Sequence, residues 1–425
     1  MASAERDIPT VSHLENHRIV ELIYDREAGK TALVVAENGA WETAQSVTAK
    51  NGDVLVPYPP ANNLIRHHCV LLPSEPVDHV SKEILLQDVE GYLHRYVDLS
   101  PLFERIAAHY VLLSWVFDAF NEVPYLRFRG DYGSGKTRAL IVIGSIAYRG
   151  FFASGASTVS PVFHILDRFG GTLLLDEADL RFSGKTADLV KILNNGTVKG
   201  LPVLRTVQNR QKEFNPAAFH VFGPKIVAMR EHFRDLALES RFLSEEMGGR
   251  PLRSDIPIQL PDTLEAEARS LRNRLLHFRL TNRFDIGSRP DRLIGSVAPR
   301  TNQTAIPLLS LVDDPSLRAE IGAYMKESQN TLVRRQSQES ESLTLEIAAR
   351  SLQEQNGRAV PLHEIAARIS RAGENSEGVS ARFVGHVLRE NAIPLRKSHG
   401  TIVVPGNAAE ALEAWLQQNS GPPAS

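Results

Sequence analysis

An eight-residue glycine-rich segment, residues 130–137, constrains the fold of this chain more than any other feature. Its sequence, Gly-Asp-Tyr-Gly-Ser-Gly-Lys-Thr, matches the pattern G-x-x-x-x-G-K-[ST] at every fixed position. The three glycines permit positive φ angles and let backbone N–H groups approach a phosphate closely. A strand-like segment, residues 125–129, precedes the loop, and residues 138–146 have a helical pattern. The sequence therefore predicts a strand–loop–helix unit that binds phosphate.

This loop predicts ATP and Mg²⁺ as ligands. Lys136 would neutralise the β- and γ-phosphates, and the hydroxyl group of Thr137 would bind the metal ion. The N-terminus of the helix that begins near Lys136 adds a favourable dipole. We expect the nucleotide to contact all eight loop residues, which are Gly130, Asp131, Tyr132, Gly133, Ser134, Gly135, Lys136 and Thr137.

A second motif, Gly-Thr-Leu-Leu-Leu-Asp-Glu-Ala-Asp, occupies residues 171–179. A run of aliphatic residues that ends in two carboxylates is typical of a buried strand that brings acids to the carboxyl edge of a parallel sheet. We expect Asp176 to hold Mg²⁺, largely through water, and Glu177 to polarise the attacking water. Glu177 and Lys136 are therefore candidate catalytic residues, whereas Asp179 fits a helix cap or a surface position.

These two motifs resemble those of the AAA+ class of P-loop ATPases. A third segment extends the resemblance, because residues 222–229 have the pattern of another central strand and residues 235–242 read Asp-Leu-Ala-Leu-Glu-Ser-Arg-Phe. In that class, an arginine in the latter element reaches the γ-phosphate of a neighbouring subunit. The resemblance implies that Arg241 is a catalytic arginine of this kind and that the chain forms a homo-oligomeric ring. A structural, ion-pairing role for Arg241 is the alternative.

The sensor positions depart from the AAA+ pattern. Met229 or Arg230 stands where asparagine or threonine is usual, which leaves the sensor chemistry open. Arg272 and Arg274 lie on a predicted lid helix at residues 264–276 and are candidates for a second sensor. Exposed arginines are common on helices, so these two residues do not by themselves indicate a sensor.

The first eighty residues predict a small β-rich module. Strand-like alternation and short apolar runs bounded by turn residues support this interpretation. The expected strands lie at residues 19–24, 31–35, 54–57 and 70–73. The module contains no catalytic constellation, and we expect it to have a packing or positioning role.

From residue 81 the pattern changes first to helices and then to alternating strands and helices. This alternation predicts an α/β fold with a mostly parallel, helix-covered sheet. A polar stretch after it fits a linker or a solvated helix extension. The predicted domains are a β-rich N-terminal module at 1–80, a P-loop AAA+-like ATPase domain with a helical lid at 81–325, a linker at 326–342, and a winged-helix domain with a disordered tail at 343–425.

The C-terminal segment predicts a winged helix-turn-helix. Residues 361–370 and 381–390 have amphipathic helical patterns, and residues 395–404 fit two strands joined by His399 and Gly400. The basic face of the second helix would enter a DNA major groove, and basic residues of the wing would contact phosphates. We expect DNA contacts from Arg382, His386, Arg389, Arg396 and Lys397. Winged helices also bind proteins, and that alternative stays open.

Composition narrows the class of function. The formal net charge is −2, so any DNA-binding surface must be local. The single cysteine, Cys69, excludes an internal disulfide and a cysteine-based zinc site, and it fits a reducing cytoplasm. The N-terminus lacks a signal-peptide pattern and the longest apolar stretch is too short for a bilayer, so we expect a cytoplasmic chain with no membrane partner. The histidines, including His67 and His68, lack ligand spacing and fit surface or packing roles.

The order of these parts resembles that of ATPases of prophages, plasmids and integrated elements, which are similar to replication primase-helicases. The resemblance implies ATP-driven work on DNA. We predict an ATP-hydrolysing DNA motor of helicase or replication-initiator type, from a mobile element. The alternative is an ATP-dependent regulatory or scaffold switch whose winged helix binds a protein partner or an operator. The Asp176–Glu177 pair fits water activation better than phosphorylation of a hydroxyl group, which disfavours a kinase.

Overall fold

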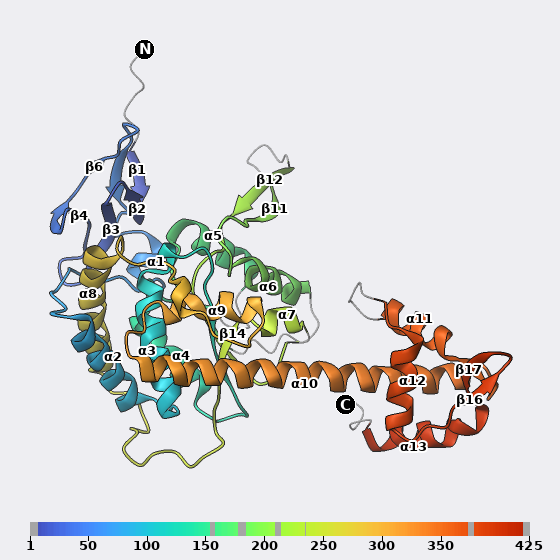
Figure 1. Cartoon of the computed structure of the whole chain (residues 1–425). Coiled ribbons are helices and arrows are strands. Elements are labelled where there is room, and N and C mark those ends of the chain that lie inside the picture. The colour runs from blue at the N-terminus through green and yellow to red at the C-terminus, as the bar shows by residue number, and fades with distance from the viewer. Residues whose placement is uncertain are drawn as a thin grey trace. The chain divides into compact units, whose positions relative to one another are not determined.

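A computed structural model, shown in Figure 1, describes residues 7–153, 158–176, 184–208, 214–233, 235–372 and 378–419. The chain divides into two units, residues 1–329 and residues 330–425. Among the described residues, every helix is too short or too polar to cross a lipid bilayer. The finer division into four segments stays a prediction.

Five parallel strands form the central sheet of the first unit. Their order is β14-β8-β13-β10-β9, and every neighbouring pair is parallel. The strands are β8 (Tyr125–Arg129), β9 (Phe151–Ala153), β10 (Leu173–Leu175), β13 (Lys225–Met229) and β14 (Phe242–Glu246). The expected α/β class with a parallel sheet is thus confirmed.

Helices cover both faces of this sheet. Leu126 and Phe128 of β8 pack into one apolar cluster with residues of α3, α4 and α8, while Tyr125 packs into a second cluster with residues of α5 and α6. Because both faces are buried, the strands β9, β10 and β13 consist almost wholly of apolar residues, whereas β8 and β14 also carry charged residues. The helices of this unit are α1 (Asn63–Arg66), α2 (Lys82–Tyr96), α3 (Pro101–Trp115), η1 (Phe117–Ala119), α4 (Lys136–Ile146), α5 (Val159–Phe169), α6 (Gly184–Asn195), α7 (Leu236–Glu239), α8 (Leu264–Asn282), η2 (Pro290–Arg292) and α9 (Pro299–Leu309).

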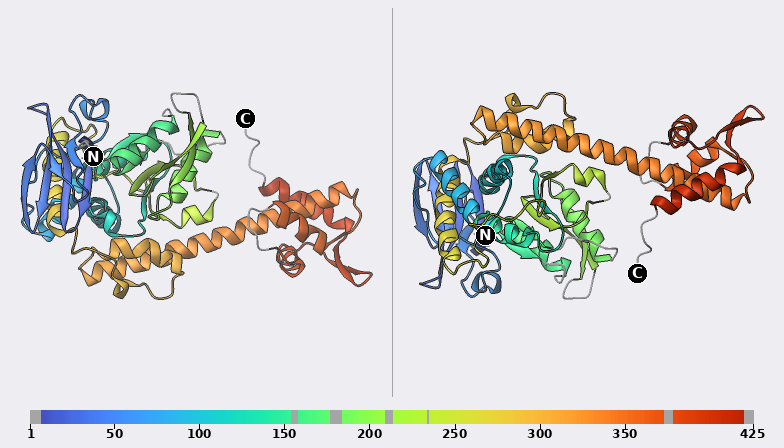
Figure 2. Two further views of the ribbon diagram at one scale, coloured as in Figure 1. Left: turned by 90° about the horizontal axis from the view of Figure 1, so that it is seen from above. Right: turned by 90° about the horizontal axis from the view of Figure 1, so that it is seen from below.

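The structure places seven strands between residues 7 and 57. The order β2-β3-β4-β5 forms an antiparallel sheet, and β1, β7 and β6 form a second, smaller sheet. Both views in Figure 2 show the yellow helix α8 against these blue strands. The strands are β1 (Asp7–Thr10), β2 (Ser12–Glu15), β3 (Arg18–Asp25), β4 (Lys30–Glu37), β5 (Ala40–Ala44), β6 (Val47–Thr48) and β7 (Val54–Pro57).

The expectation of a strand at residues 70–73 is wrong. That segment is irregular, because its backbone bonds go to separate parts of the unit and form no ladder. The N–H of Leu71 donates to the oxygen of Gly150 at 3.0 Å, and the oxygen of Pro73 accepts from the N–H of Tyr24 at 2.9 Å. The other three expected N-terminal strands lie within β3, β4 and β7.

Lys225, the first residue of β13, has no exposed surface. Its Nζ donates to the backbone oxygens of Val221 at 2.8 Å and Gly223 at 3.0 Å, and it lies 4.8 Å from the ring centre of Tyr125. Burial lowers the pKa of Lys225 to about 7 from an ordinary value of 10.5. The side chain therefore joins the start of a central strand to the loop before it.

Because burial lowers the pKa of Lys225, we expect the free energy of unfolding to rise with pH. Between the lowered pKa and the ordinary one, the unfolded chain binds the proton and the folded chain does not, so raising the pH favours the folded state. Between about pH 7 and 9, the free energy of unfolding should rise by roughly 1 kcal/mol per pH unit more than in a Lys225→Met variant. Denaturant unfolding of both proteins tests this expectation. The Lys191→Met variant, which removes an exposed lysine, is the control. If the free energy of unfolding changed with pH to the same extent in wild type and in Lys225→Met, the expectation would be contradicted.

The described part of the second unit contains the C-terminal part of a long helix, three shorter α-helices and a three-stranded antiparallel sheet of order β15-β17-β16. His399 and Gly400 have φ angles of 46° and 81°, as a two-residue hairpin turn requires. The polar segment 326–342 lies within α10 and is helical, which agrees with the helix-extension alternative. The helix α10 (Pro315–Glu354) begins in the first unit and continues into the second. The other elements of the second unit are β15 (Val360–Pro361), α11 (Leu362–Ala372), α12 (Ala381–Glu390), β16 (Arg396–Ser398), β17 (Thr401–Val404), η3 (Gly406–Ala408) and α13 (Ala409–Asn419). Their interpretation as a winged helix stays a prediction.

Candidate functional site

The glycine-rich segment forms a tight turn between β8 and α4. Gly130, Gly133 and Gly135 have φ angles of 146°, 77° and 93°, in the region that favours glycine. A Cβ atom at Gly130 would lie only 2.3 Å from the backbone oxygen of Met247, so a larger residue there would displace the backbone. The turn can therefore approach a ligand with its bare backbone, as phosphate binding requires.

Lys136, the first residue of α4, lies over this turn. Its Nζ donates to the backbone oxygen of Gly130 at 2.7 Å, to that of Asp131 at 2.6 Å and to Oγ of Ser134 at 3.3 Å. These bonds hold a positive charge at the loop and at the N-terminus of α4. Both features favour an anionic ligand in this place.

Thr137 and Asp176 meet at the carboxyl edge of the sheet. Oγ1 of Thr137 donates to Oδ1 of Asp176 at 3.2 Å, although the two residues are 39 positions apart. The N–H of Asp176 donates to the oxygen of Ala153 at 3.2 Å, which fixes the residue at the end of β10. A hydroxyl oxygen beside a carboxylate suits Mg²⁺, so the residues present fit a magnesium-bound nucleotide. Glu177 lies outside the described residues.

A cavity of about 1040 Å³ lies beside residues 130–135 of the loop, and Lys136, Thr137 and Asp176 are not among the residues that line it. It is lined by loop residues and by the segment after β14, because β14 is parallel to β8 and ends at the same edge of the sheet. The charged residues that line it are Asp98, Arg129, Asp131, Arg138, Arg230, Glu245, Glu246 and Arg250. Arg230 follows β13 directly and therefore stands at the expected sensor position.

Residues 245–250 were not expected at this site. Their signal in the sequence is Gly248-Gly249-Arg250, a glycine pair and a basic residue directly after a strand. The sequence alone does not show that this segment lies at the site. The parallel pairing of β14 with β8 brings it there, because both strands end at the same edge of the sheet. Arg138 was assigned only to a helix, but its guanidinium group donates to the backbone oxygens of Pro257 and Ile258 and so holds one wall of the cavity.

A buried ion pair supports the sheet beneath the site. Arg127 of β8 donates from Nη1 and Nη2 to the two carboxylate oxygens of Glu239 at 2.7 and 2.8 Å. Burial would raise the pKa of Glu239, but hydrogen bonds from His232 and Arg127 and the charge of Arg127 lower it to about 2. Glu239 therefore stays ionised and ties α7 to the strand that leads into the glycine-rich loop.

Arg241 is bonded within its own chain. Its Nη1 donates to the backbone oxygen of Leu193 at 3.2 Å and to the backbone and side-chain oxygens of Asn194, the latter at 2.9 Å. The guanidinium group thus binds the last carbonyls of α6, where a cation is favoured. These bonds give Arg241 a structural role, which was the alternative to a catalytic role for this residue. A contact with a neighbouring subunit stays a prediction.

The two second-sensor candidates have internal partners. Arg272 is fully buried and donates to the backbone oxygen of Ser145 at 2.6 Å and to Glu265 at 2.9 Å. Arg274 pairs with Asp88 of α2. Neither residue lines the cavity beside the loop. Both therefore fasten α8 to its neighbours.

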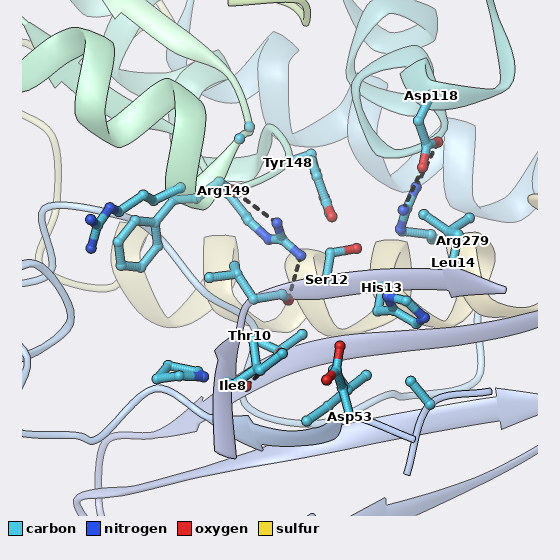
Figure 3. Close-up of a pocket in the computed structure, with 18 of the residues that line it drawn as sticks. Ile8, Thr10, Ser12, His13, Leu14, Asp53, Asp118, Tyr148, Arg149 and Arg279 are labelled. Carbon is cyan, nitrogen blue, oxygen red and sulfur yellow. Dashed lines mark hydrogen bonds and ion pairs between the residues drawn. The ribbon is translucent and has the colours of Figure 1, made fainter. Parts of the chain in front are cut away.

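A second cavity, of about 520 Å³, lies between the N-terminal strands and the core (Figure 3). Beside it, the buried carboxylate of Glu21 accepts hydrogen bonds from Arg149, from Nε of Arg279 at 2.8 Å and from the hydroxyl group of Tyr148 at 3.0 Å. Burial would raise the pKa of Glu21, but the charges of Arg149 and Arg279 lower it. Arg279 also donates to Asp118 at 2.8 Å. The carboxylates of Glu21 and Asp118 are thus paired with the guanidinium groups of Arg149 and Arg279. We interpret this cluster as structural, because it holds the N-terminal strands against the core.

A two-stranded hairpin, β11 (Val203–Gln208) and β12 (Phe214–Phe219), leaves the core between α6 and β13. Figure 1 shows it projecting from the unit beside α5. Its base is anchored, because Phe219 is buried and Arg205 lies 4.5 Å from the ring centre of Phe163. Leu204 and Phe214 are instead 70% and 72% exposed. The hairpin was not expected from the sequence. It exposes these two apolar side chains to solvent.

The expected DNA-contacting residues of the second unit are exposed. Three lie on α12 and two on β16, and they are Arg382, His386, Arg389, Arg396 and Lys397. Nε2 of His386 lies 3.3 Å from a carboxylate oxygen of Glu390. Each residue is thus available to a partner, and whether that partner is DNA stays a prediction.

Comparison with known proteins gives only distant likenesses of fold. No protein-family model matches the chain, and no curated protein gives a significant match. One similar solved structure is the C-terminal region of NrS-1, with 10% identity, a TM-score of 0.34, and 91% of this chain and 96% of that chain covered. Two others are JCV helicase, with 15% identity, a TM-score of 0.25 and coverage of 59% and 61%, and Cdc6p from Pyrobaculum aerophilum, with 12% identity, a TM-score of 0.20 and coverage of 81% and 99%. We therefore base the function on the chain's own residues.

Proposed function

We propose that the chain is a P-loop ATPase that hydrolyses ATP and acts on DNA, as a helicase or replication initiator of a mobile element. The hydrogen bond between Thr137 and Asp176, beside the Lys136 ammonium group, is the observation that supports this proposal most. Two motifs far apart in sequence meet in the geometry that a magnesium-bound triphosphate needs. The parallel sheet places both at one edge.

The roles of the residues follow from their chemistry. The N–H groups of the loop and Lys136 bind the phosphates, and Thr137 and Asp176 hold Mg²⁺, which neutralises charge on the phosphates when bound. Glu177 orients the water that attacks the terminal phosphate. Arg230 follows β13 directly and lines the cavity beside residues 130–135 of the loop, so it is our candidate for the residue that responds to that phosphate.

Oligomerisation through Arg241 forms part of the proposal. As a trans-acting group, Arg241 would leave the carbonyls of Leu193 and Asn194 and reach a neighbouring nucleotide. Those carbonyls would then need other partners. We propose that the phosphates of a nucleotide bound between subunits of a ring accept the hydrogen bonds of Arg241, while water donates to the freed carbonyls.

The hairpin β11–β12 supports action on DNA. Its exposed Phe214 offers a ring on which a base can stack, and Leu204 offers an apolar contact. Stacking on aromatic side chains is how single strands are bound without sequence preference. The hairpin precedes β13 in the chain, and β13 is followed directly by Arg230, so a short connection joins the hairpin to a strand of the central sheet.

ATP turnover with and without DNA tests the proposal. We expect single-stranded or duplex DNA to stimulate phosphate release by the full chain, and we expect the Lys136→Ala variant to release phosphate about 100- to 1000-fold more slowly with either DNA. Absence of turnover under all conditions would contradict an ATPase. Turnover that is indifferent to both DNAs would contradict the action on DNA while leaving ATP hydrolysis in place.

Single-stranded DNA binding is expected to weaken in the Phe214→Ala and Leu204→Ala variants. Loss of one base–aromatic stack costs roughly 1–3 kcal/mol, so the dissociation constant should rise about 5-fold or more for Phe214→Ala. Fluorescence anisotropy with a labelled oligonucleotide measures this change. Leu293→Ala, which removes another exposed leucine, is the control. Equal affinities for all four proteins would remove the hairpin from the DNA interface.

A regulatory or scaffold switch is the second candidate function. It is favoured by the surface of the second unit, where Phe383 and Ile402 are 37% and 41% exposed among the basic residues. Such a mixed surface also suits a protein partner. Slow turnover without DNA stimulation, together with nucleotide-dependent assembly in light scattering, would support this function over the motor.

A further inference from the structure

Three side chains with metal-binding atoms meet away from the nucleotide cavity. Nδ1 of His79 lies 2.8 Å from Nδ1 of His277, although the residues are 198 positions apart. Oδ1 of Asp78 lies 3.7 Å from the same His277 nitrogen. One potential ligand atom of each residue lies within 4.8 Å of the other two. Two imidazoles and a carboxylate therefore converge on one small volume.

The fold holds the two histidines in place from both sides. His277 lies one turn after Asn273 on α8, and Asn273 fastens the incoming segment to that helix. Its Oδ1 accepts from the N–H of Ser74 at 2.9 Å, and its backbone oxygen accepts from the N–H of Val77 at 3.1 Å. His79 is 8% exposed and packs edge-on against the ring of Phe278. The ring positions are thus set by packing before any ligand binds.

A strained turn places the carboxylate beside the histidines. Val80 has a φ angle of 63°, which is rare for a β-branched residue, and it is 70% exposed. Its N–H donates to Oδ1 of Asp78 at 2.9 Å. No packing of the Val80 side chain explains the strain, and strained backbone is often retained where it positions a functional group.

We propose that Asp78, His79 and His277 bind one divalent transition-metal ion of the zinc class. Nitrogen and carboxylate donors are what such an ion prefers, and three protein ligands leave a further position for water. Ligand atoms around a tetrahedral ion stand about 3.3 Å apart. The 2.8 Å and 3.7 Å separations lie on either side of that value, so small side-chain movements complete the site.

The charges around the cluster permit a cation. Asp78 supplies a negative charge at the solvent side of the cluster. The nearby Arg274 is paired with Asp88 of α2, which offsets its charge. The bound ion would fasten the segment that carries residues 78 and 79 to α8. This role requires no ATP, so it does not depend on the proposed function.

Metal binding by the full chain tests the site directly. The protein, stripped with a chelator and kept in excess Mg²⁺ to occupy oxygen-rich sites, is titrated with Zn²⁺ by calorimetry and with Co²⁺ by visible absorption. We expect one tight equivalent, a cobalt spectrum typical of nitrogen ligation, and a higher unfolding temperature with Zn²⁺.

Two variants separate the metal site from a plain histidine–histidine hydrogen bond. Asp78→Asn keeps an oxygen for the N–H of Val80 at an exposed position, so the fold should persist while Zn²⁺ affinity falls at least tenfold. His277→Gln should abolish the tight equivalent, and His67→Gln, outside the cluster, should leave it unchanged. The proposal is overturned if wild-type protein binds no tight equivalent, or if Asp78→Asn and His277→Gln both bind Zn²⁺ as wild type does.

Discussion

Replacing Lys136 with alanine is expected to lower ATP turnover about 100- to 1000-fold, which is the usual effect of removing one preorganised positive or donor group from a charged transition state. The Nζ of Lys136 is held by the backbone oxygens of Gly130 and Asp131, so the charge lies at the loop without further rearrangement of the helix. Initial rates of phosphate release, measured from sub-saturating to saturating ATP concentrations, give kcat and kcat/KM separately. The loss should appear mainly in kcat/KM, because Lys136 contacts the phosphates from binding through hydrolysis.

The matched control for this prediction is Lys50→Ala. Lys50 is an exposed lysine of the N-terminal strands, so its removal should leave turnover unchanged. Circular dichroism of both variants confirms that the fold persists. If Lys136→Ala turned over ATP at the wild-type rate, the glycine-rich loop would not be the catalytic nucleotide site.

Replacing Arg127 with methionine is expected to lower the free energy of unfolding by about 3–5 kcal/mol. The substitution leaves the carboxylate of Glu239 buried with one cationic partner fewer, and an uncompensated buried charge is strongly destabilising. Arg127 is 3% exposed and Glu239 is 2% exposed, so solvent offers little compensation. Denaturant unfolding followed by tryptophan emission measures the change, since Trp115 is buried in the same unit.

An exposed ion pair supplies the comparison. Nη1 of Arg95 lies 2.8 Å from Oε2 of Glu267, but the Arg95 side chain is 58% exposed. The Arg95→Ala substitution should therefore lower the free energy of unfolding by at most about 1 kcal/mol. Similar losses for Arg127→Met and Arg95→Ala would mean that the buried pair does not stabilise the sheet. A large loss for Arg127→Met alone would establish that α7 and β8 depend on each other.

Local patterns predicted the parts of the site that are continuous in sequence. The strand at residues 125–129 and the helix that begins near Lys136 were placed at the observed bounds, and the strand expected at residues 222–229 begins three residues later, at Lys225. Glycine spacing and apolar runs determine these elements, and both are local properties. The position of Asp176 beside Thr137 also followed, because parallel strands deliver their ends to one edge.

Contacts between distant segments could not be predicted in this way. The histidines were interpreted as surface or packing residues because the sequence shows no ligand spacing, and nothing in it indicates that the fold brings Nδ1 of His79 to 2.8 Å from Nδ1 of His277. The hairpin β11–β12 was missed because residues 208–213 within this segment are all basic, acidic or polar and resemble a loop. The bonds of Arg241 to α6 likewise depend on packing that a motif does not encode.

The strand order of the central sheet also determines when it can form during synthesis. β8 pairs with β13 and β14, whose residues follow it by about a hundred positions. On the ribosome, the strand that leads into the glycine-rich loop therefore emerges long before either neighbour exists. Until both have been translated, an apolar strand has at least one open edge and is prone to aggregate. We infer that the nascent chain must be shielded, by its own helices or by a chaperone, until translation has passed residue 246.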